Sequence, residues 1–312
     1  MPAFAFVFPG QGSQTVGMLD AWGDHPAVRQ TLEEASAALG EDLGRLIHEG
    51  PAEALGLTTN TQPVMLAAAI ACYRAWRAVG GAEPAAVAGH SLGEYSALVA
   101  AEALSLAEAL PLVRFRAQAM QQAVPVGAGA MAAILGLDAA VVAGVCTKVA
   151  AASGEPVEPA NFNDPKQTVI AGSKAGVDAA CAELKAAGAK RALLLPVSAP
   201  FHSSLMKPAA EALREKLAGV ALKSPRFPVV NNIDVAVQTE PDAIREALYR
   251  QAFGPVRWVE VTQALKARGL LHLIECGPGT VLSGLVKRVD ADIVSTTINT
   301  PAGLKAAQEL LA

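Results

Sequence analysis

The clearest chemistry in this chain lies in the pentapeptide Gly89-His90-Ser91-Leu92-Gly93. An apolar stretch, residues 85–88, precedes it, and an alanine-rich segment that we expect to be helical, residues 94–100, follows it. A strand, a tight turn and a helix in that order form a nucleophile elbow, which exposes the serine beside the free N–H groups of a helix start. The pattern predicts serine-based acyl chemistry at Ser91.

A nucleophilic serine needs a base, and His202 is the best candidate among the five histidines. Residues 197–203 form a predicted loop before a helix, the setting in which functional side chains are commonly mounted. His90 adjoins Ser91, but neighbouring side chains of an extended segment point in opposite directions. The other histidines, in polar surroundings or in an apolar strand, are His25, His48 and His272.

The third member of a triad is not evident from the residue types. The five acidic residues considered between Ser91 and His202 all fall in a segment that we expect to form a separate small domain. A backbone carbonyl that orients the imidazole is therefore an alternative to an acidic residue. The acidic residues considered are Asp138, Glu155, Glu158, Asp164 and Asp178.

Two further features bear on this site. Residues 8–14, Phe-Pro-Gly-Gln-Gly-Ser-Gln, follow the first expected strand, where the ligand-facing loops of a parallel sheet gather. The glycines beside Gln11 would let its backbone N–H approach a reacting carbonyl oxygen, although an ordinary turn is the alternative. Arg116 interrupts an apolar helix and could bind a carboxylate in a bidentate manner. Its alternative is a surface arginine whose aliphatic stem covers apolar side chains.

The elements that position these residues predict an α/β fold. We expect a large α/β-hydrolase-like domain with a mostly parallel sheet, formed by residues 1–126 and 198–312. Residues 127–197 read as strand, helix, strand, strand, helix, strand, which is the order of a small ferredoxin-like (βαββαβ) domain. In the large domain we expect strands at 3–8, 85–89 and 270–275, and helices at 63–79, 92–101, 105–123, 203–218, 242–251, 259–268 and 281–289.

Composition excludes several classes of protein. Of 312 residues, 52% are hydrophobic and 17% charged, which indicates a large core and excludes disorder. A net charge of −4 without a basic run gives no reason to expect nucleic acid, and no apolar run suggests a membrane span. The apolar N-terminus lacks the basic leader of a signal peptide. Four scattered cysteines indicate reduced thiols in a cytoplasmic protein.

Several blocks in fixed order resemble the malonyl-CoA:acyl-carrier-protein transacylase family. The resemblance runs from residue 4 to about residue 289 and is carried by residues 8–14, 89–95, 116 with 120–121, 200–202, 255–258 and 275–285. It implies that Ser91 is the nucleophile and His202 its base and later its acid. It further implies that the main-chain carbonyl of Gln251 orients His202, and that the N–H groups of Gln11 and Leu92 form the oxyanion hole.

The same resemblance implies the substrates. Arg116 would pair with the malonyl carboxylate, Asn161 would lie near the acyl-donor cleft, and Phe201 would crowd an α-methyl substituent. The implied reaction is ping-pong transfer from malonyl-CoA to acyl carrier protein in fatty-acid synthesis, by a monomer without a metal or redox cofactor. Basic residues considered for docking the acidic carrier are Lys190, Arg191, Lys207, Lys287 and Arg288.

Other readings stay open. A serine thioesterase or esterase would share the elbow but would have no use for Arg116. A non-catalytic carrier-docking protein would be expected to have lost Ser91 or His202. Service to polyketide synthesis or to malonate decarboxylation is compatible with the same residues.

Overall fold

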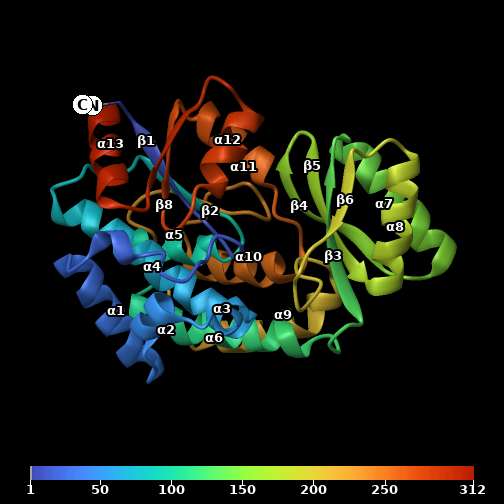
Figure 1. Ribbon diagram of the computed structural model, residues 1–312, viewed down its shortest axis with the longest axis horizontal. Helices are drawn as coiled ribbons and strands as arrows, with labels where there is room; N and C mark the ends of the chain where they lie inside the picture. The colour runs from blue at the N-terminus through green and yellow to red at the C-terminus, as the bar shows by residue number, and fades with distance from the viewer. Residues whose placement is uncertain (1) are drawn as a thin grey trace.

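The computed structural model describes residues 2–312, and its strands form two separate sheets (Figure 1). The larger sheet has five strands, all parallel, in the order β7-β2-β1-β8-β9. The expected parallel sheet is confirmed, with two strands more than expected. The strands are β1 (Phe4–Phe8), β2 (Ala86–Gly89), β7 (Val229–Val230), β8 (His272–Cys276) and β9 (Val294–Ile298).

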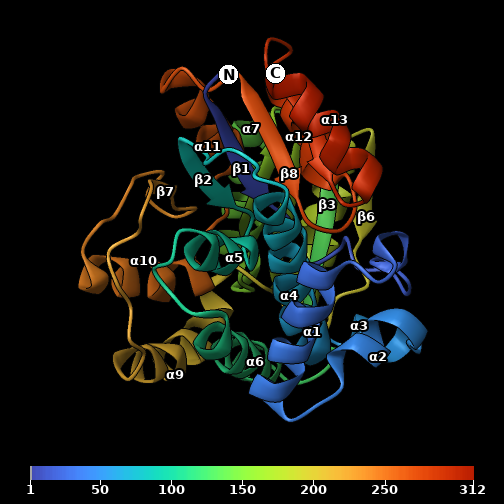
Figure 2. The same cartoon turned by 90° about the vertical axis from the view of Figure 1, so that its left-hand side faces the viewer.

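Alternate side chains of β1 belong to two hydrophobic cores, one on each face of this sheet. Phe4, Phe6 and Phe8 pack in the core built with α4, α5, α6 and α9. Ala5 and Val7 pack in the second core, with α11 and α12. Figure 2 shows α5, α6 and α9 below the strands of this sheet. Burial on both faces explains why β1 is apolar at every position.

The sequence predicted only some of the helices around this sheet, those that correspond to α4, α5, α6, α9, α10, α11 and α12. Their bounds are η1 (Asp20–Trp22), α1 (Pro26–Leu39), α2 (Leu43–Glu49), α3 (Ala52–Gly56), α4 (Thr58–Ala78), α5 (Gly93–Ala100), α6 (Leu106–Gln122), η2 (Ser204–Met206), α9 (Lys207–Ala218), α10 (Pro241–Phe253), α11 (Trp258–Ala267), α12 (Val281–Val289) and α13 (Pro301–Leu311). No helix among residues 2–312 combines the length and apolar character needed to span a bilayer.

The smaller sheet is antiparallel, with the strand order β4-β5-β3-β6. Its two helices pack on one face, which Figure 1 shows turned away from the parallel sheet. The opposite face carries Met131 and Val169, and Phe201 packs against it. The elements are β3 (Gly129–Leu135), α7 (Ala139–Ser153), β4 (Val157–Asp164), β5 (Gln167–Ser173), α8 (Lys174–Ala186) and β6 (Arg191–Leu194).

The smaller sheet is fastened to the rest of the molecule along β4. The Val256 N–H donates to the Ala160 carbonyl at 2.8 Å, and the Phe162 N–H donates to the Val256 carbonyl at 2.9 Å. Nearby, Arg288 of α12 donates to the buried carboxylate of Asp164 at 2.6 Å. These contacts fix β4 beside the segment that follows α10.

Candidate active site

Ser91 stands on a tight turn between β2 and α5. Its φ is +53°, a conformation that side chains rarely adopt. The flanking glycines are required by space, because a Cβ on Gly89 would lie 1.9 Å from the Gly93 carbonyl carbon. A Cβ on Gly93 would lie 2.1 Å from the Phe8 carbonyl oxygen. The strand and the helix therefore approach closely enough to expose the serine at the carboxyl end of the sheet.

The Ser91 hydroxyl contacts the imidazole of His202. Ser91 Oγ lies 2.6 Å from His202 Nε2, and His202 Nδ1 lies 3.0 Å from the Gln251 carbonyl and 3.2 Å from the Gly254 carbonyl. With two carbonyl acceptors, Nδ1 carries the proton and Nε2 faces the serine with its lone pair. Burial and, secondly, the Arg116 charge lower the pKa of His202 to about 3, which keeps the ring neutral. Within the described residues, 2–312, no acidic side chain bonds to His202 Nδ1.

Arg116 is 2% exposed and reaches the same serine from α6. One terminal nitrogen donates to Gln62 Oε1 at 2.8 Å, and the other to Gln251 Oε1 at 3.0 Å and to Ser91 Oγ at 3.5 Å. No carboxylate among residues 2–312 pairs with this guanidinium, and its Nε has no partner there. A buried cation held by two neutral amides is suited to receive an anionic ligand.

The backbone of the elbow is held by Asn232. Its Oδ1 accepts from the Ser91 N–H at 2.7 Å, and its Nδ2 donates to the Gly89 carbonyl at 2.6 Å. The Ser91 N–H is thereby occupied. The N–H groups of Gln11 and Leu92, by contrast, have no hydrogen-bond acceptor among the described residues. Two unoccupied N–H groups beside a nucleophile are what an oxyanion hole requires.

These groups open into one cavity of about 550 Å³. Its polar wall includes Ser91, His202 and Arg116, and its apolar wall comes from the smaller sheet and the loop after β6. Asn161 of β4, which is buried, and Phe201 also line it. All the residues that the sequence singled out for the site therefore lie at or next to one cavity, between the loops that follow β1 and β2 and the smaller sheet.

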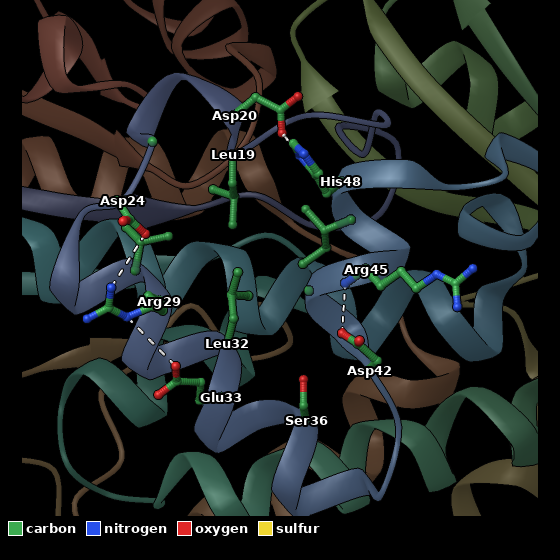
Figure 3. Close-up of a pocket in the computed structure, with 14 residues that line it drawn as sticks. Leu19, Asp20, Asp24, Arg29, Leu32, Glu33, Ser36, Asp42, Arg45 and His48 are labelled. Atoms are coloured by element: carbon green, nitrogen blue, oxygen red, sulfur yellow. Dashed lines mark hydrogen bonds and ion pairs between the residues drawn. The ribbon is translucent and has the colours of Figure 1, made fainter.

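A larger cavity, of about 840 Å³, lies elsewhere, between η1, α1 and α2 (Figure 3). Its charged side chains satisfy one another: His48 bonds to Asp20, and Arg29 to Asp24 and Glu33. Its serine and its histidine have other partners: Ser36 accepts from the Leu43 N–H at 3.1 Å, and His48 is held by Asp20. We therefore assign the chemistry to the cavity at Ser91.

Sequence reasoning missed three residues that organise the site: Gln62, Glu94 and Asn232. Gln62 holds Arg116 from α4, and Glu94 lies in the first turn of α5. The Asn231-Asn232 pair directly follows the apolar strand β7. A polar pair at the carboxyl end of a parallel strand was the available signal, but β7 has only two residues and was not recognised.

His90 does not contact Ser91 through its side chain. Its Nε2 lies 2.8 Å from Asn163 Oδ1, and its ring packs against Trp258 with 5.4 Å between centroids. Arg288, considered for carrier docking, is paired with Asp164.

Comparison with known proteins places the chain among acyltransferases. The family described as the acyl transferase domain matches residues 5–298. The malonyl CoA-acyl carrier protein transacylase of Escherichia coli K12 is 54% identical and covers 99% of this chain and 100% of its own. The protein of that name from Bacillus subtilis is 46% identical, over 100% of this chain and 98% of its own.

Solved structures agree with these relatives. The acyl-carrier-protein S-malonyltransferase of Burkholderia pseudomallei is 63% identical, with a TM-score of 0.97 over 98% of this chain and 99% of its own. A malonyl-transacylase solved in complex with a type II PKS acyl-carrier protein is 49% identical, with a TM-score of 0.97 over 99% of both chains.

Proposed function

The chain belongs to the acyl transferase domain family, among the malonyl-CoA:acyl-carrier-protein transacylases, and we propose that it works through a malonyl ester on Ser91. It takes the malonyl group from malonyl-CoA and passes it to the phosphopantetheine thiol of acyl carrier protein, supplying fatty-acid synthesis. The relative solved with a type II PKS carrier leaves polyketide synthesis as the second pathway for the same activity.

In the first half-reaction Ser91 Oγ attacks the thioester carbonyl while His202 Nε2 takes the hydroxyl proton. The carbon–sulfur bond then breaks, and the CoA sulfur leaves with the proton from His202. The support is the 2.6 Å contact of the two side chains and the depressed pKa of His202, which keeps Nε2 available as a base. The second half-reaction reverses these steps: the carrier thiol gives its proton to His202 and attacks the ester, and Ser91 Oγ recovers that proton.

The carbonyl oxygen becomes negatively charged in both half-reactions. The N–H groups of Gln11 and Leu92 stabilise it, as the two donors beside Ser91 that have no other acceptor in the described chain. The Gln251 carbonyl holds the tautomer of His202 at 3.0 Å. Gln251 thus does through its backbone what an acidic residue does in a triad.

A single observation supports the choice of a malonyl group: Arg116 is buried within 3.5 Å of Ser91 Oγ, and no carboxylate of the described chain pairs with it. The malonyl carboxylate supplies that partner and positions the thioester carbonyl for attack. Asn161 and Phe201 bound the acyl-donor side of the cavity, where Phe201 disfavours an α-methyl group.

The domain division rests on the two sheets. We assign residues 1–126 and 198–312 to an α/β-hydrolase-like domain and 127–197 to a ferredoxin-like one, supported by the strand order β4-β5-β3-β6. The proposed steps need no metal or redox cofactor, and a monomer contains every residue they use.

Intact-protein mass spectrometry tests the proposal. Brief mixing with malonyl-CoA should add one malonyl group to the wild type and none to Ser91→Ala, and holo acyl carrier protein should then remove it. Release as free malonate without the carrier would indicate a hydrolase. Absence of any adduct on the wild type would contradict the role of Ser91.

A further inference from the structure

Glu94 is a buried carboxyl group that none of the proposed steps uses. It lies three residues after Ser91, and its side chain is 2% exposed. Its Oε2 accepts from the Asn232 N–H at 2.8 Å and from Gln251 Nε2 at 3.1 Å. Acidic side chains are almost never fully buried without a partner that carries the opposite charge.

Gln251 joins Glu94 to that charge. Its amide oxygen accepts from Arg116 at 3.0 Å, while its amide nitrogen donates to Glu94. Arg116 and Glu94 are thus opposite charges separated by one amide group, in a region where both are buried. With the site empty, each is the compensating charge of the other.

Few other charges act on Glu94. Burial raises its pKa to about 7, Arg116 lowers that pKa and Asp234 raises it. Asp234 is itself paired with Arg250 of α10, at 2.6 and 2.7 Å. The neighbouring strands β1 and β2 carry no titratable side chain. The remaining titratable groups of the surrounding elements are Tyr95 of α5, His202, Cys72, Tyr73, Arg74 and Arg77 of α4, Glu108 and Arg114 of α6, and Asp242, Arg245, Glu246 and Tyr249 of α10.

We propose that the malonyl carboxylate replaces Glu94 as the counter-charge of Arg116, and that Glu94 takes up a proton from solvent when the malonyl group binds. Two carboxylates then compete for one guanidinium in a buried site, and the one that is not in direct contact with it is neutralised. This inference rests on the proposed function, because it requires the malonyl carboxylate at Arg116. An acetyl group brings no charge and leaves Glu94 ionised.

The proposal makes Glu94 a specificity-determining residue. As pH rises and Glu94 ionises in the empty site, malonyl binding must include protonation of Glu94, whereas acetyl binding does not. Affinity for malonyl-CoA should therefore fall with rising pH, by up to about tenfold per pH unit above the pKa of Glu94. Affinity for acetyl-CoA should stay level.

Isothermal titration calorimetry of Ser91→Ala, which binds without reacting, measures the proton directly. Malonyl-CoA is titrated at about pH 7.5 in buffers of different ionisation enthalpy, and we expect uptake of about half a proton or more. Acetyl-CoA should give none. Ser91→Ala/Glu94→Gln should bind malonyl-CoA without uptake, because glutamine keeps the shape but cannot titrate.

The matched control is Ser91→Ala/Glu275→Gln. Glu275 is also buried with a raised pKa, but it bonds to the Leu282 and Ser283 N–H groups at the start of α12. Proton uptake should persist in this variant. If the Glu94 variant does not fold, the pH dependence of malonyl-CoA and acetyl-CoA binding to Ser91→Ala provides the test.

The outcomes separate the two proposals. Malonyl-CoA binding without proton uptake would overturn the role of Glu94. Uptake that survives Glu94→Gln would also overturn it, by placing the proton on another group such as His202. Failure of malonyl-CoA to bind at all, with the protein folded, would contradict the proposed function instead.

Discussion

Arg114 and Arg116 show that the surroundings of an arginine decide whether it forms a surface ion pair or lies buried in a site. Both lie on α6, two positions apart, and point in different directions. Arg114 makes a bidentate pair with Glu41 at 2.8 and 2.6 Å, whereas Arg116 is buried beside Ser91 with neutral partners. Sequence alone gave two readings of Arg116, and only packing distinguishes them, because Gln62 and Gln251 come from distant parts of the chain.

Replacement of Arg116 tests its proposed role in holding the malonyl carboxylate. Arg116→Ala should reduce kcat/KM for malonyl-CoA by about 10- to 150-fold, the effect of losing a hydrogen bond to a charged group of about 1.5–3 kcal/mol. Acetyl loading of Ser91 should be spared, since the acetyl group has no carboxylate. The measurement is the rate of acyl–enzyme formation with each donor. Arg114→Ala is the control, and equal losses for both donors would contradict that role.

At the scale of elements, the elbow depends on the packing of β2 against α5. The sequence predicted both elements and the two glycines because this motif is local. It did not predict α1, α2, α3, β7, β9 or α13, whose positions depend on contacts with distant segments. From the sequence, α4 was also expected to begin at Pro63, because proline is common at the first position of a helix. The helix begins at Thr58, and Pro63 is buried inside it, where tertiary packing outweighs the lost N–H donor.

Two glycine-to-alanine substitutions distinguish a glycine required by close packing from a glycine that only lowers helix propensity. Gly89→Ala should lower the free energy of unfolding by about 2–4 kcal/mol, because its Cβ would meet backbone at 1.9 Å. Gly144→Ala in α7 should raise it by about 0.5–1 kcal/mol, since nothing lies within 4 Å of the added Cβ and alanine favours a helix. Urea unfolding measures both. A neutral Gly89→Ala would show that strand and helix can separate without loss.

At the scale of the whole molecule, the cavity lies between the smaller sheet and the loops that follow β1 and β2. The family resemblance predicted which residues meet there, but the fastening of β4 by Val256 and by the Arg288–Asp164 pair had no sequence signal. Backbone pairing between residues 160 and 256 is invisible to any local pattern. These contacts hold Asn161 of the smaller sheet against the cavity.

Removal of Arg288 tests this fastening. Arg288→Ala should raise the KM for malonyl-CoA in acyl–enzyme formation by about two- to fivefold, corresponding to about 0.5–1 kcal/mol for a partly exposed pair. The maximal acylation rate should remain, because Ser91 and His202 keep their own supports. Measuring this half-reaction alone excludes any effect on carrier docking. The adjacent, exposed Lys287 provides the control Lys287→Ala, and an equal change in both variants would argue against the fastening.

The backbone and the side chain of Gln251 contact different parts of the site. Its carbonyl aligns His202, whereas its amide contacts Arg116, Glu94 and the Ser91 carbonyl. Every amino acid has that carbonyl, so mutation at this position should leave the alignment of His202 in place while it alters the surroundings of Arg116, the proposed acyl anchor. Substitutions at Gln251 should therefore change which acyl group is accepted without abolishing acyl transfer. Saturation mutagenesis at this position is a direct route to enzymes that load other acyl groups.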